Sequence, residues 1–437
     1  MIDCRQLATN IEQVRTLTLA GRVKEVIGLV ITGQGPLAAV GGVCAIEGAS
    51  PSTPVLAEVV GFRHQGVLLM PYGEVRGVEP GARITLTQNQ ALVPVGEALL
   101  GRVIDGLGRP IDGLGPIWTK TRYPLYVSPL NPVSRELINE PVDVGVRAVN
   151  GLLTLGKGQR VGIFSGSGVG KSTLMGMVAR YTKSDVSVIG LVGERGREVK
   201  EFIEKDLGPE GLARSVVVAA TSDTPALIRL RAAYLSTAIA EYFRDQGRDV
   251  ILMVDSVTRF AMAAREVGLA IGEPPTARGY TPSVFSQLPR ILERAGTHAG
   301  PGSITGIYTV LVEGDDLTEP IADAVRSIAD GHIVLSRELA DRGHYPAIDV
   351  LGSISRVMPS ITDPEHRKYQ RQLIQVVAAY RQAEDLININ AYVRGSNPEV
   401  DFALDKIDRV NQFLRQEVDQ GVSLAESVQN LAALFAD

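Results

Sequence analysis

The sequence predicts an α/β protein with a mostly parallel sheet at its centre, a small β-domain before the sheet and a helical region after it. Short β-like runs separated by glycines fill residues 21–90. Apolar strand-like runs alternate with helical stretches over residues 145–360, the pattern of a parallel sheet covered by helices. From residue 363 onward only helical spacing remains. Because 437 residues exceed one typical core, we expect several domains.

Changes in this pattern set the expected domain boundaries. The four expected parts are an N-terminal helix (1–22), a β-barrel domain (23–92), the α/β domain (93–360) and a C-terminal helical domain (361–437). Leu7, Ile11, Val14 and Leu17 give the first helix one apolar face. That face either packs on its own domain or docks a partner.

Short strands at close spacing predict that the β-domain is a small barrel or sandwich. The expected strands are residues 23–31, 55–60, 66–70 and 82–86. Residues 101–113 are dense in turn formers, so we expect a connecting segment there.

The C-terminal region carries clear helix signals. Asp363 and Pro364 provide an N-cap and a proline at the first helical position. Ser423 and Glu426 have the spacing of a capping box, which predicts a final helix.

Composition excludes several classes of function. The formal net charge of −5 argues against a general polyanion binder, and Cys4 and Cys44 provide neither a disulfide framework nor a metal cluster. No apolar stretch approaches the ~20 residues that span a bilayer, and the N-terminus lacks a secretory signal. We therefore expect a cytoplasmic protein.

Residues 165–172 read Ser-Gly-Ser-Gly-Val-Gly-Lys-Ser and form a candidate phosphate-binding loop. The P-loop pattern is G-x-x-x-x-G-K-[ST], and Ser165 stands at its first position. An apolar run precedes the loop and helical spacing follows it. In this context Lys171 would reach the β- and γ-phosphates, and the Ser172 hydroxyl would take a Mg²⁺ position. The chain is expected to bind a nucleoside triphosphate.

Two further apolar runs end in charged residues. The run 250–254 leads to Asp255, which either holds Mg²⁺ or caps the next helix. The run 188–193 leads to Glu194 and Arg195. Because ligands of open α/β sheets bind at the carboxyl ends of the strands, Glu194 would face the phosphate loop and could act on the attacking water. A surface ion pair is the alternative for these two residues.

Longer motifs resemble those of a known family. The runs 193–198 (Gly-Glu-Arg-Gly-Arg-Glu) and 345–349 (Tyr-Pro-Ala-Ile-Asp), the latter ahead of residues 353–356 (Ser-Ile-Ser-Arg), resemble rotary ATP synthase catalytic subunits. The segments 278–289, 314–321 and 330–337 are similar to the type III secretion ATPases, meaning the flagellar protein-export ATPase and its virulence-injectisome relatives. A serine or alanine at the first loop position suits that family, and the resemblance covers nearly the whole chain.

The resemblance implies a RecA-like P-loop ATPase core that uses ATP and Mg²⁺, and it implies residue roles. Glu194 would be the general base, Arg195 a γ-phosphate contact and Arg259 a support for the Glu194 region. Tyr345 would pack on the adenine, although a core tyrosine is the alternative, and Arg356 would be an arginine finger that reaches a neighbouring subunit. The expected catalytic residues are Lys171, Glu194, Arg195, Asp255, Arg259 and Arg356. The expected nucleotide-binding residues are Ser165, Gly166, Ser167, Gly168, Val169, Gly170, Lys171, Ser172, Thr173 and Tyr345. The expected metal-binding residues are Ser172 and Asp255.

The resemblance also implies partners. Since Glu194 and Arg356 occur in one chain, identical copies could complete every interface of a homohexameric ring. Further implied partners are a peripheral-stalk regulator at the N-terminal helix, a central coiled-coil stalk, export-gate membrane proteins, and export substrates with their chaperones. The implied location is the inner-membrane export apparatus.

Three other functions compete with flagellar export. They are an injectisome ATPase, a hexameric RNA translocase and a nucleotide-binding subunit without turnover. A barrel with Phe62 and Tyr72 as its aromatics between residues 23 and 93 is poorly equipped to stack bases, so no nucleic-acid partner is expected. Glu194 argues against a subunit without turnover.

Overall fold

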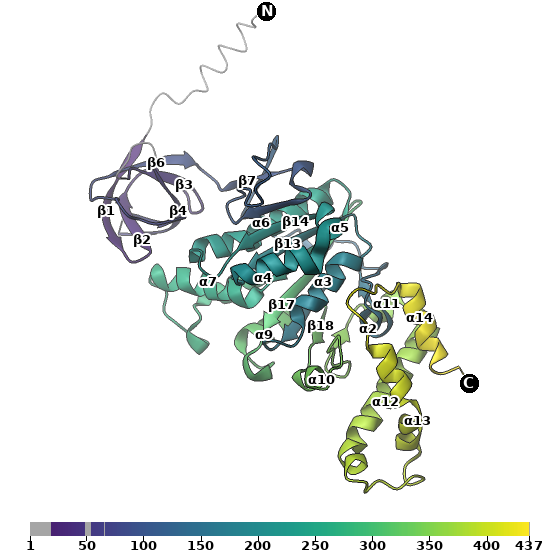
Figure 1. The fold of residues 1–437 in the computed structure, drawn as a ribbon. Coiled ribbons are helices and arrows are strands. Elements are labelled where there is room, and N and C mark those ends of the chain that lie inside the picture. Colours follow the sequence, from purple (N-terminus) through teal and green to yellow (C-terminus); the bar gives the residue numbers. More distant parts are fainter. Residues whose placement is uncertain (1–18, 49–53, 65, 437) are drawn as a thin grey trace, which may run out of the picture. The chain divides into compact units, whose positions relative to one another are not determined.

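A computed structural model describes residues 19–48, 54–64 and 66–436 of the chain (Figure 1). These residues form two compact units. The first comprises the described residues up to Leu92 together with residues 266–274, and the second comprises residues 93–265 and 275–436. The expected N-terminal docking helix lies outside the described residues.

The first unit is a closed six-stranded barrel in the order β1-β2-β5-β4-β3-β6 (Figure 1). Its strands are β1 (Ala20–Ile27), β2 (Val30–Gln34), β3 (Val43–Ile46), β4 (Val55–Arg63), β5 (Gly66–Pro71) and β6 (Arg83–Gln88). The core of the barrel consists of alternating inward side chains such as Ile31, Ile46, Leu69 and Ile84, all fully buried. This confirms the predicted barrel.

The expected single strand over residues 23–31 is wrong, because the chain reverses at Gly28 and forms a β1–β2 hairpin. Gly28 has a φ of 55°, a left-handed conformation that glycine adopts without strain. Strand β3 was not predicted.

The second unit is built on a nine-stranded sheet in the order β19-β18-β12-β17-β15-β13-β14-β8, with β16 paired to β17. Its strands are β8 (Arg102–Asp105), β12 (Arg160–Ser165), β13 (Val186–Val192), β14 (Ser215–Ala220), β15 (Asp249–Asp255), β16 (Gly296–Thr297), β17 (Ser303–Leu311), β18 (Gly331–Val334) and β19 (Ile354–Ser355). The pairs from β18 through to β8 are parallel, whereas β16 and β19 pair antiparallel with their neighbours. The mostly parallel α/β core is thereby confirmed. The turn-rich segment 101–113 contains β8, a sheet strand rather than only a connection.

Helices cover both faces of this sheet. Gly190 of β13 leaves room for Ser236 of α6 (Ala226–Asp245), because a Cβ at Gly190 would lie 2.6 Å from the Ser236 hydroxyl. Its neighbour Ile189 belongs instead to the core cluster that contains Met175 of α3 (Lys171–Tyr181). Since successive strand residues point to opposite faces, α6 and α3 lie on opposite sides of the sheet.

Before residue 363, the other α-helices of the described residues are 4 to 14 residues long. They are α2 (Arg147–Leu152), α4 (Gly196–Glu201), α5 (Gly208–Ala213), α7 (Val257–Ala270), α8 (Pro282–Leu292), α9 (Pro320–Ile328), α10 (Arg337–Asp341) and α11 (Met358–Ile361). Two small sheets complete the strands, β7 (Leu92–Val95) with β9 (Thr121–Pro124) and β10 (Pro141–Val142) with β11 (Leu155–Gly156).

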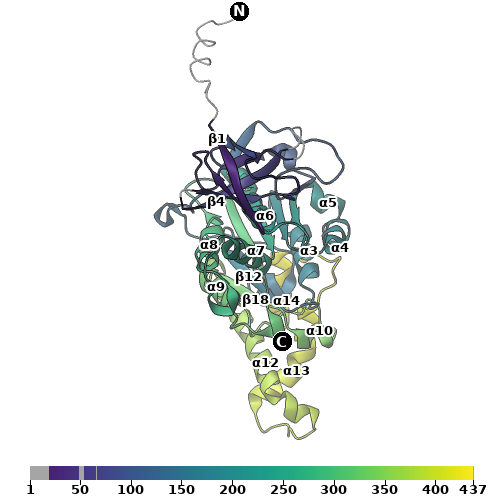
Figure 2. The same ribbon diagram turned by 90° about the vertical axis from the view of Figure 1, so that its left-hand side faces the viewer.

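The predicted C-terminal helices are confirmed as α12 (Pro364–Asn388), α13 (Pro398–Leu414) and α14 (Leu424–Ala433). Asp363 caps α12 through the backbone N–H of His366 (2.7 Å), and Ser423 forms the full capping box with Glu426. Helices α12 and α13 lie side by side in both views (Figures 1 and 2). Leu373, Phe413 and Leu431 share the core cluster of the sheet, so the helical region is part of the second unit and packs against its core.

Candidate active site

The candidate phosphate-binding loop joins β12 to α3, as its sequence predicted. Gly170 precedes the helix with a φ of 94°, and no side chain caps the first turn of α3. The first N–H groups of a helix have no carbonyl partner within the helix, and together with the helix dipole they attract anions. The loop therefore offers unused backbone donors where phosphate oxygens would bind.

Most of the predicted nucleotide residues line one cavity of about 800 Å³ beside this loop. The predicted residues that line it are Gly166, Ser167, Gly168, Gly170, Lys171, Ser172, Thr173, Glu194, Arg195 and Arg259. The side chains of Ser165 and Val169 are buried beneath the loop, and they do not line the cavity. Among the described residues, the Ser165 hydroxyl has no hydrogen-bond partner. These two residues therefore shape the loop from below.

Three strands bring Lys171, Glu194 and Asp255 together, although the buried Asp255 does not itself line the cavity. Lys171 begins α3, Glu194 follows β13 and Asp255 ends β15. Because these strands are parallel, their carboxyl ends lie at one edge of the sheet. The Lys171 ammonium forms an ion pair with the Asp255 carboxylate and a second one with Glu194 at 3.4 Å. The predicted convergence of the loop with these two carboxylates is therefore observed.

Burial and charge set the protonation of this cluster. Burial of the Glu194 carboxyl raises its pKa to about 7, and the negative charge of Asp255 adds to the rise while Lys171 opposes it. Burial disfavours a charged Lys171, but the two carboxylates outweigh it and hold the pKa of the ammonium above its usual value. Glu194 thus has a pKa suited to gaining and losing a proton near neutral pH.

Asp255 is fixed by a neighbouring strand. The Thr309 hydroxyl on β17 donates a hydrogen bond of 2.6 Å to the Asp255 carboxylate, which is almost completely buried. Ser172, by contrast, is exposed on the cavity side of α3. A hydroxyl and a carboxylate are oxygen ligands of the kind that Mg²⁺ prefers, and the ammonium resting on Asp255 marks a place that favours a cation. The donor set fits Mg²⁺.

Two arginines flank Glu194. Arg195 is exposed, with its guanidinium 3.4 Å from the Glu198 carboxylate. Arg259 packs beneath the residue before Glu194, because a Cβ added at Gly193 would come within 2.8 Å of the Arg259 Cβ. Among the described residues, the buried Arg259 Nε has no hydrogen-bond partner. Arg259 thus supports the Glu194 turn through packing.

Tyr345 lies at a neighbouring cavity of about 460 Å³. The two cavities share Gly170 and Thr173, and a Cβ at Gly170 would lie 3.6 Å from the Tyr345 ring. The ring is about half exposed (46%). An aromatic face next to the phosphate loop is placed where a nucleotide base would stack.

The sequence reasoning missed several residues of these cavities. Arg337 at the start of α10 donates to the Ser167 carbonyl (3.3 Å), and it lines the phosphate cavity. Residues 415–418, which follow α13, line the base cavity, and the Gln416 backbone N–H donates to the Tyr345 carbonyl (3.0 Å). Arg337 ends one of the motifs noted in the sequence, but no motif marked residues 415–418.

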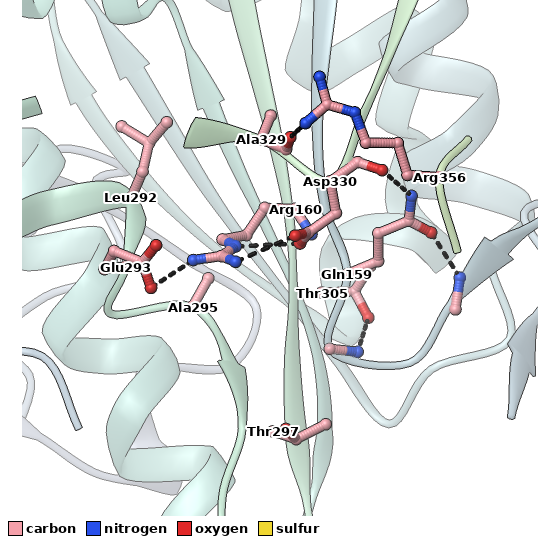
Figure 3. A network of polar contacts seen from close by, with 12 residues as sticks. Gln159, Arg160, Leu292, Glu293, Ala295, Thr297, Thr305, Ala329, Asp330 and Arg356 are labelled. Carbon is pink, nitrogen blue, oxygen red and sulfur yellow. Dashed lines mark hydrogen bonds and ion pairs between the residues drawn. The ribbon is translucent and has the colours of Figure 1, made fainter. Parts of the chain in front are cut away.

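Arg356 does not join the other predicted catalytic residues within one chain. It follows β19 and lines a separate cavity with Arg135, Arg160 and Asp330. Its guanidinium donates to the Ala329 carbonyl at 3.2 Å (Figure 3). An arginine exposed away from the chain's own phosphate loop is available to a neighbouring molecule.

Comparison with protein families covers each part of the chain. Residues 23–88 match the β-barrel domain of the ATP synthase alpha/beta family, and residues 145–355 match its nucleotide-binding domain. Residues 362–433 match the C-terminal domain described as that of the type III secretion ATPase EscN.

Full-length relatives agree with these matches. The flagellum-specific ATP synthase of Bacillus subtilis is 53% identical over 99% of this chain and 98% of its own length. A type 3 secretion system ATPase of Xanthomonas euvesicatoria is 50% identical over 95% of this chain and 94% of its own. The assembled ATPase EscN of enteropathogenic E. coli superposes with a TM-score of 0.90 at 45% identity, covering 95% of this chain and all of that chain. EscN has also been solved in complex with its central stalk EscO, at a TM-score of 0.88 over the same shares and at the same identity.

No helix among the described residues is long and apolar enough to cross a bilayer.

Proposed function

Because the chain belongs to the type III secretion ATPases within the ATP synthase alpha/beta family and is an ATP-hydrolysing enzyme, we propose that it energises export of flagellar proteins as a homohexameric ring. The observation that carries the hydrolysis on which this proposal depends is the contact of Lys171 with both Asp255 and Glu194 beside the phosphate loop. This contact supports a site in which the phosphate loop, the Glu194 carboxyl and the proposed metal ligand Asp255 act together.

The residues around the phosphate loop have different roles in hydrolysis. The loop N–H groups and Lys171 bind the phosphates, which requires Lys171 to leave its carboxylate partners when ATP enters. Ser172 and Asp255 would hold Mg²⁺, which neutralises charge on the phosphate oxygens when it is bound. Glu194, released from Lys171, orients the attacking water and accepts its proton. Tyr345 stacks on the base and Arg195 contacts the γ-phosphate.

Substitution of Glu194 by glutamine tests its proposed role as the base. The Glu194→Gln protein should bind ATP with nearly the affinity of the parent and hydrolyse it at least ~10²-fold more slowly, because glutamine keeps the shape and cannot accept the proton. Hydrolysis by the Glu194→Gln protein at the parent rate would exclude Glu194 as the base.

The proposal of a ring depends on the role of Arg356. Since it lies apart from its own chain's phosphate cavity, it serves catalysis only if it reaches a nucleotide bound to a second copy. Arg356→Ala should leave nucleotide binding by the monomer intact and lower hydrolysis by the assembled protein by ~10³-fold or more. Equal loss in both assays would exclude the finger role. Measuring particle mass with and without a non-hydrolysable ATP analogue tests the hexamer.

The export function is supported by the relatives that carry flagellar names. The other proposed partners are a peripheral-stalk regulator, a central stalk, export-gate proteins, and export substrates with their chaperones. The proposed place of action of the ring is the cytoplasmic side of the inner membrane. Restored motility in a flagellated bacterium that lacks its own export ATPase would support the flagellar assignment. Secretion restored only in a strain that lacks its injectisome ATPase would favour the injectisome alternative. The similarity to the type 3 secretion system ATPase of Xanthomonas is the reason to test this alternative.

An RNA translocase receives no support from the barrel. Tyr72 is buried and its hydroxyl donates to Glu58 (2.8 Å), which leaves Phe62 as the exposed aromatic of the described barrel residues. One aromatic does not form a stacking platform. We therefore expect no stimulation of hydrolysis by RNA.

A further inference from the structure

Arg356 is held in place by backbone carbonyls at the end of α9. Its backbone N–H donates to the Asp330 carbonyl (2.9 Å), and its guanidinium donates to the carbonyls of Ala329 (3.2 Å) and Arg326 (3.5 Å). The carboxyl end of a helix carries partial negative charge, so it favours the cation there. The position of Arg356 therefore depends on where the turn at residues 329–330 lies.

Arg160 and Asp330 hold that turn through four mutual hydrogen bonds, three donated by Arg160 and one by Asp330 (Figure 3). The Arg160 backbone N–H, Nε and Nη2 each donate to the Asp330 carboxylate at 3.0 Å, and the Asp330 N–H donates to the Arg160 carbonyl at 2.8 Å. Two parallel N–H donors on one carboxylate make a bidentate pair, which restrains orientation as well as distance. Both side chains are largely buried, at 15% and 25% exposure.

Gln159 adds a second restraint on the same turn. Its amide donates to the Asp330 carbonyl (3.3 Å) and to the hydroxyl of Ser355 (3.1 Å), the residue directly before Arg356. The Ser355 hydroxyl in turn donates to the Thr154 carbonyl (2.9 Å). The turn at residues 329–330 and the residue before Arg356 are thus both attached to residues 159 and 160.

These two residues lead into the strand that carries the phosphate loop. Arg160 is the first residue of β12, and Ser165 at the other end of β12 opens the loop. Strand β12 is hydrogen-bonded to β17 on one side and to β18 on the other. The residues that hold Arg356 therefore lie at one end of β12, and the phosphate loop lies at the other end. This short strand is hydrogen-bonded to a neighbouring strand on each side.

We propose that Arg160 and Asp330 are positioning residues for Arg356, which they hold at a fixed place relative to the strand of their own chain that carries the phosphate loop. The proposal rests on the finger role of Arg356 given above. Arg160 and Asp330 touch no substrate in this arrangement and act through the arginine alone. Glu293 provides the contrast, since its carboxylate also pairs with Arg160 and, among the contacts in Figure 3, makes none with the turn at residues 329–330.

The test is a double-mutant cycle on the full-length protein assembled with ATP and Mg²⁺. Asp330→Asn removes the charge and one bidentate acceptor, and it should lower kcat of the assembled protein about ten- to hundredfold, as small displacements of a catalytic group do. KM and the affinity of the monomer for nucleotide should stay at the parent values. In the Arg356→Ala background the same change should have no further effect on kcat. Glu293→Gln is the matched control, and it should leave kcat unchanged while perturbing the same arginine.

The outcomes separate this proposal from the function on which it rests. Parent kcat in Arg356→Ala alone would overturn the finger role itself. With that role intact, parent kcat in Asp330→Asn would overturn the positioning proposal, and so would a full additive loss in the double variant. If thermal unfolding shows that Asp330→Asn does not fold, Arg160→Lys replaces it. Lysine keeps the charge but lacks the paired N–H donors, so the same loss of kcat without a change in KM is expected.

Discussion

The raised pKa of Glu194 predicts a specific dependence of ATP hydrolysis on pH. Glu194 must be ionised to accept a proton from water, and burial raises the pKa of its carboxyl to about 7. A group with that pKa is roughly 90% ionised at pH 8 and roughly 10% ionised at pH 6. We therefore expect kcat/KM to fall about tenfold between pH 8 and pH 6, because the pH then falls through the pKa of the base in the folded enzyme.

The assay is phosphate release at subsaturating ATP and constant ionic strength, with the oligomeric state checked at each pH. Glu194→Gln should lose this limb of the profile and leave a residual rate that does not follow the same titration. Glu198→Gln is a useful control, because Glu198 adds to the raised pKa of Glu194, so its removal should move the midpoint to lower pH and keep the limb. A flat profile in the parent, or the same limb in Glu194→Gln, would refute the reasoning.

Three further substitutions test packing and binding. Gly193→Ala should destabilise the protein by about 1–3 kcal/mol in thermal unfolding, because the residue has a φ of 75° and the added Cβ would come within 2.8 Å of the Arg259 Cβ; an unchanged melting temperature would contradict this. Glu241→Ala should cost about 3–5 kcal/mol in urea unfolding, since it leaves the fully buried Arg294 guanidinium without its bidentate carboxylate; a loss below 1 kcal/mol would show that Arg294 finds another partner. Tyr345→Ala should raise KM for ATP about two- to tenfold with little change in kcat, whereas Tyr345→Phe should behave like the parent; equal effects of the two changes would remove the stacking role.

The convergence of the charged residues could be predicted because it follows from strand direction. Glu194 and Asp255 stand at the carboxyl ends of apolar runs, and the loop that leads to Lys171 starts at the end of a third; parallel strands bring those ends to one edge. Local patterns also predicted the caps of the C-terminal helices, since a capping box is formed by residues three apart. These features depend on short stretches of sequence.

Features that depend on distant contacts could not be predicted. Strand β8 is a four-residue strand in a turn-rich segment, and its pairing with β14, more than a hundred residues away, makes it part of the sheet. Gln416 reaches the base cavity from a loop without a motif, and Thr309 orients Asp255 from inside a buried strand that carries no recognisable motif. The pairing of Arg160 with Asp330 is likewise visible only once β12 and β18 are neighbours.

The central claim is that one copy supplies Glu194 and the next supplies Arg356 to each hydrolysis site. The most direct test mixes Glu194→Gln and Arg356→Ala proteins, each nearly inactive alone, and measures ATP hydrolysis by the mixed assemblies. In an equal random mixture, roughly a quarter of the interfaces join an intact Glu194 to an intact Arg356, so activity should rise toward roughly a quarter of the parent value. Mixed assemblies confirmed by mass that hydrolyse ATP no faster than the two variants separately would contradict the shared site.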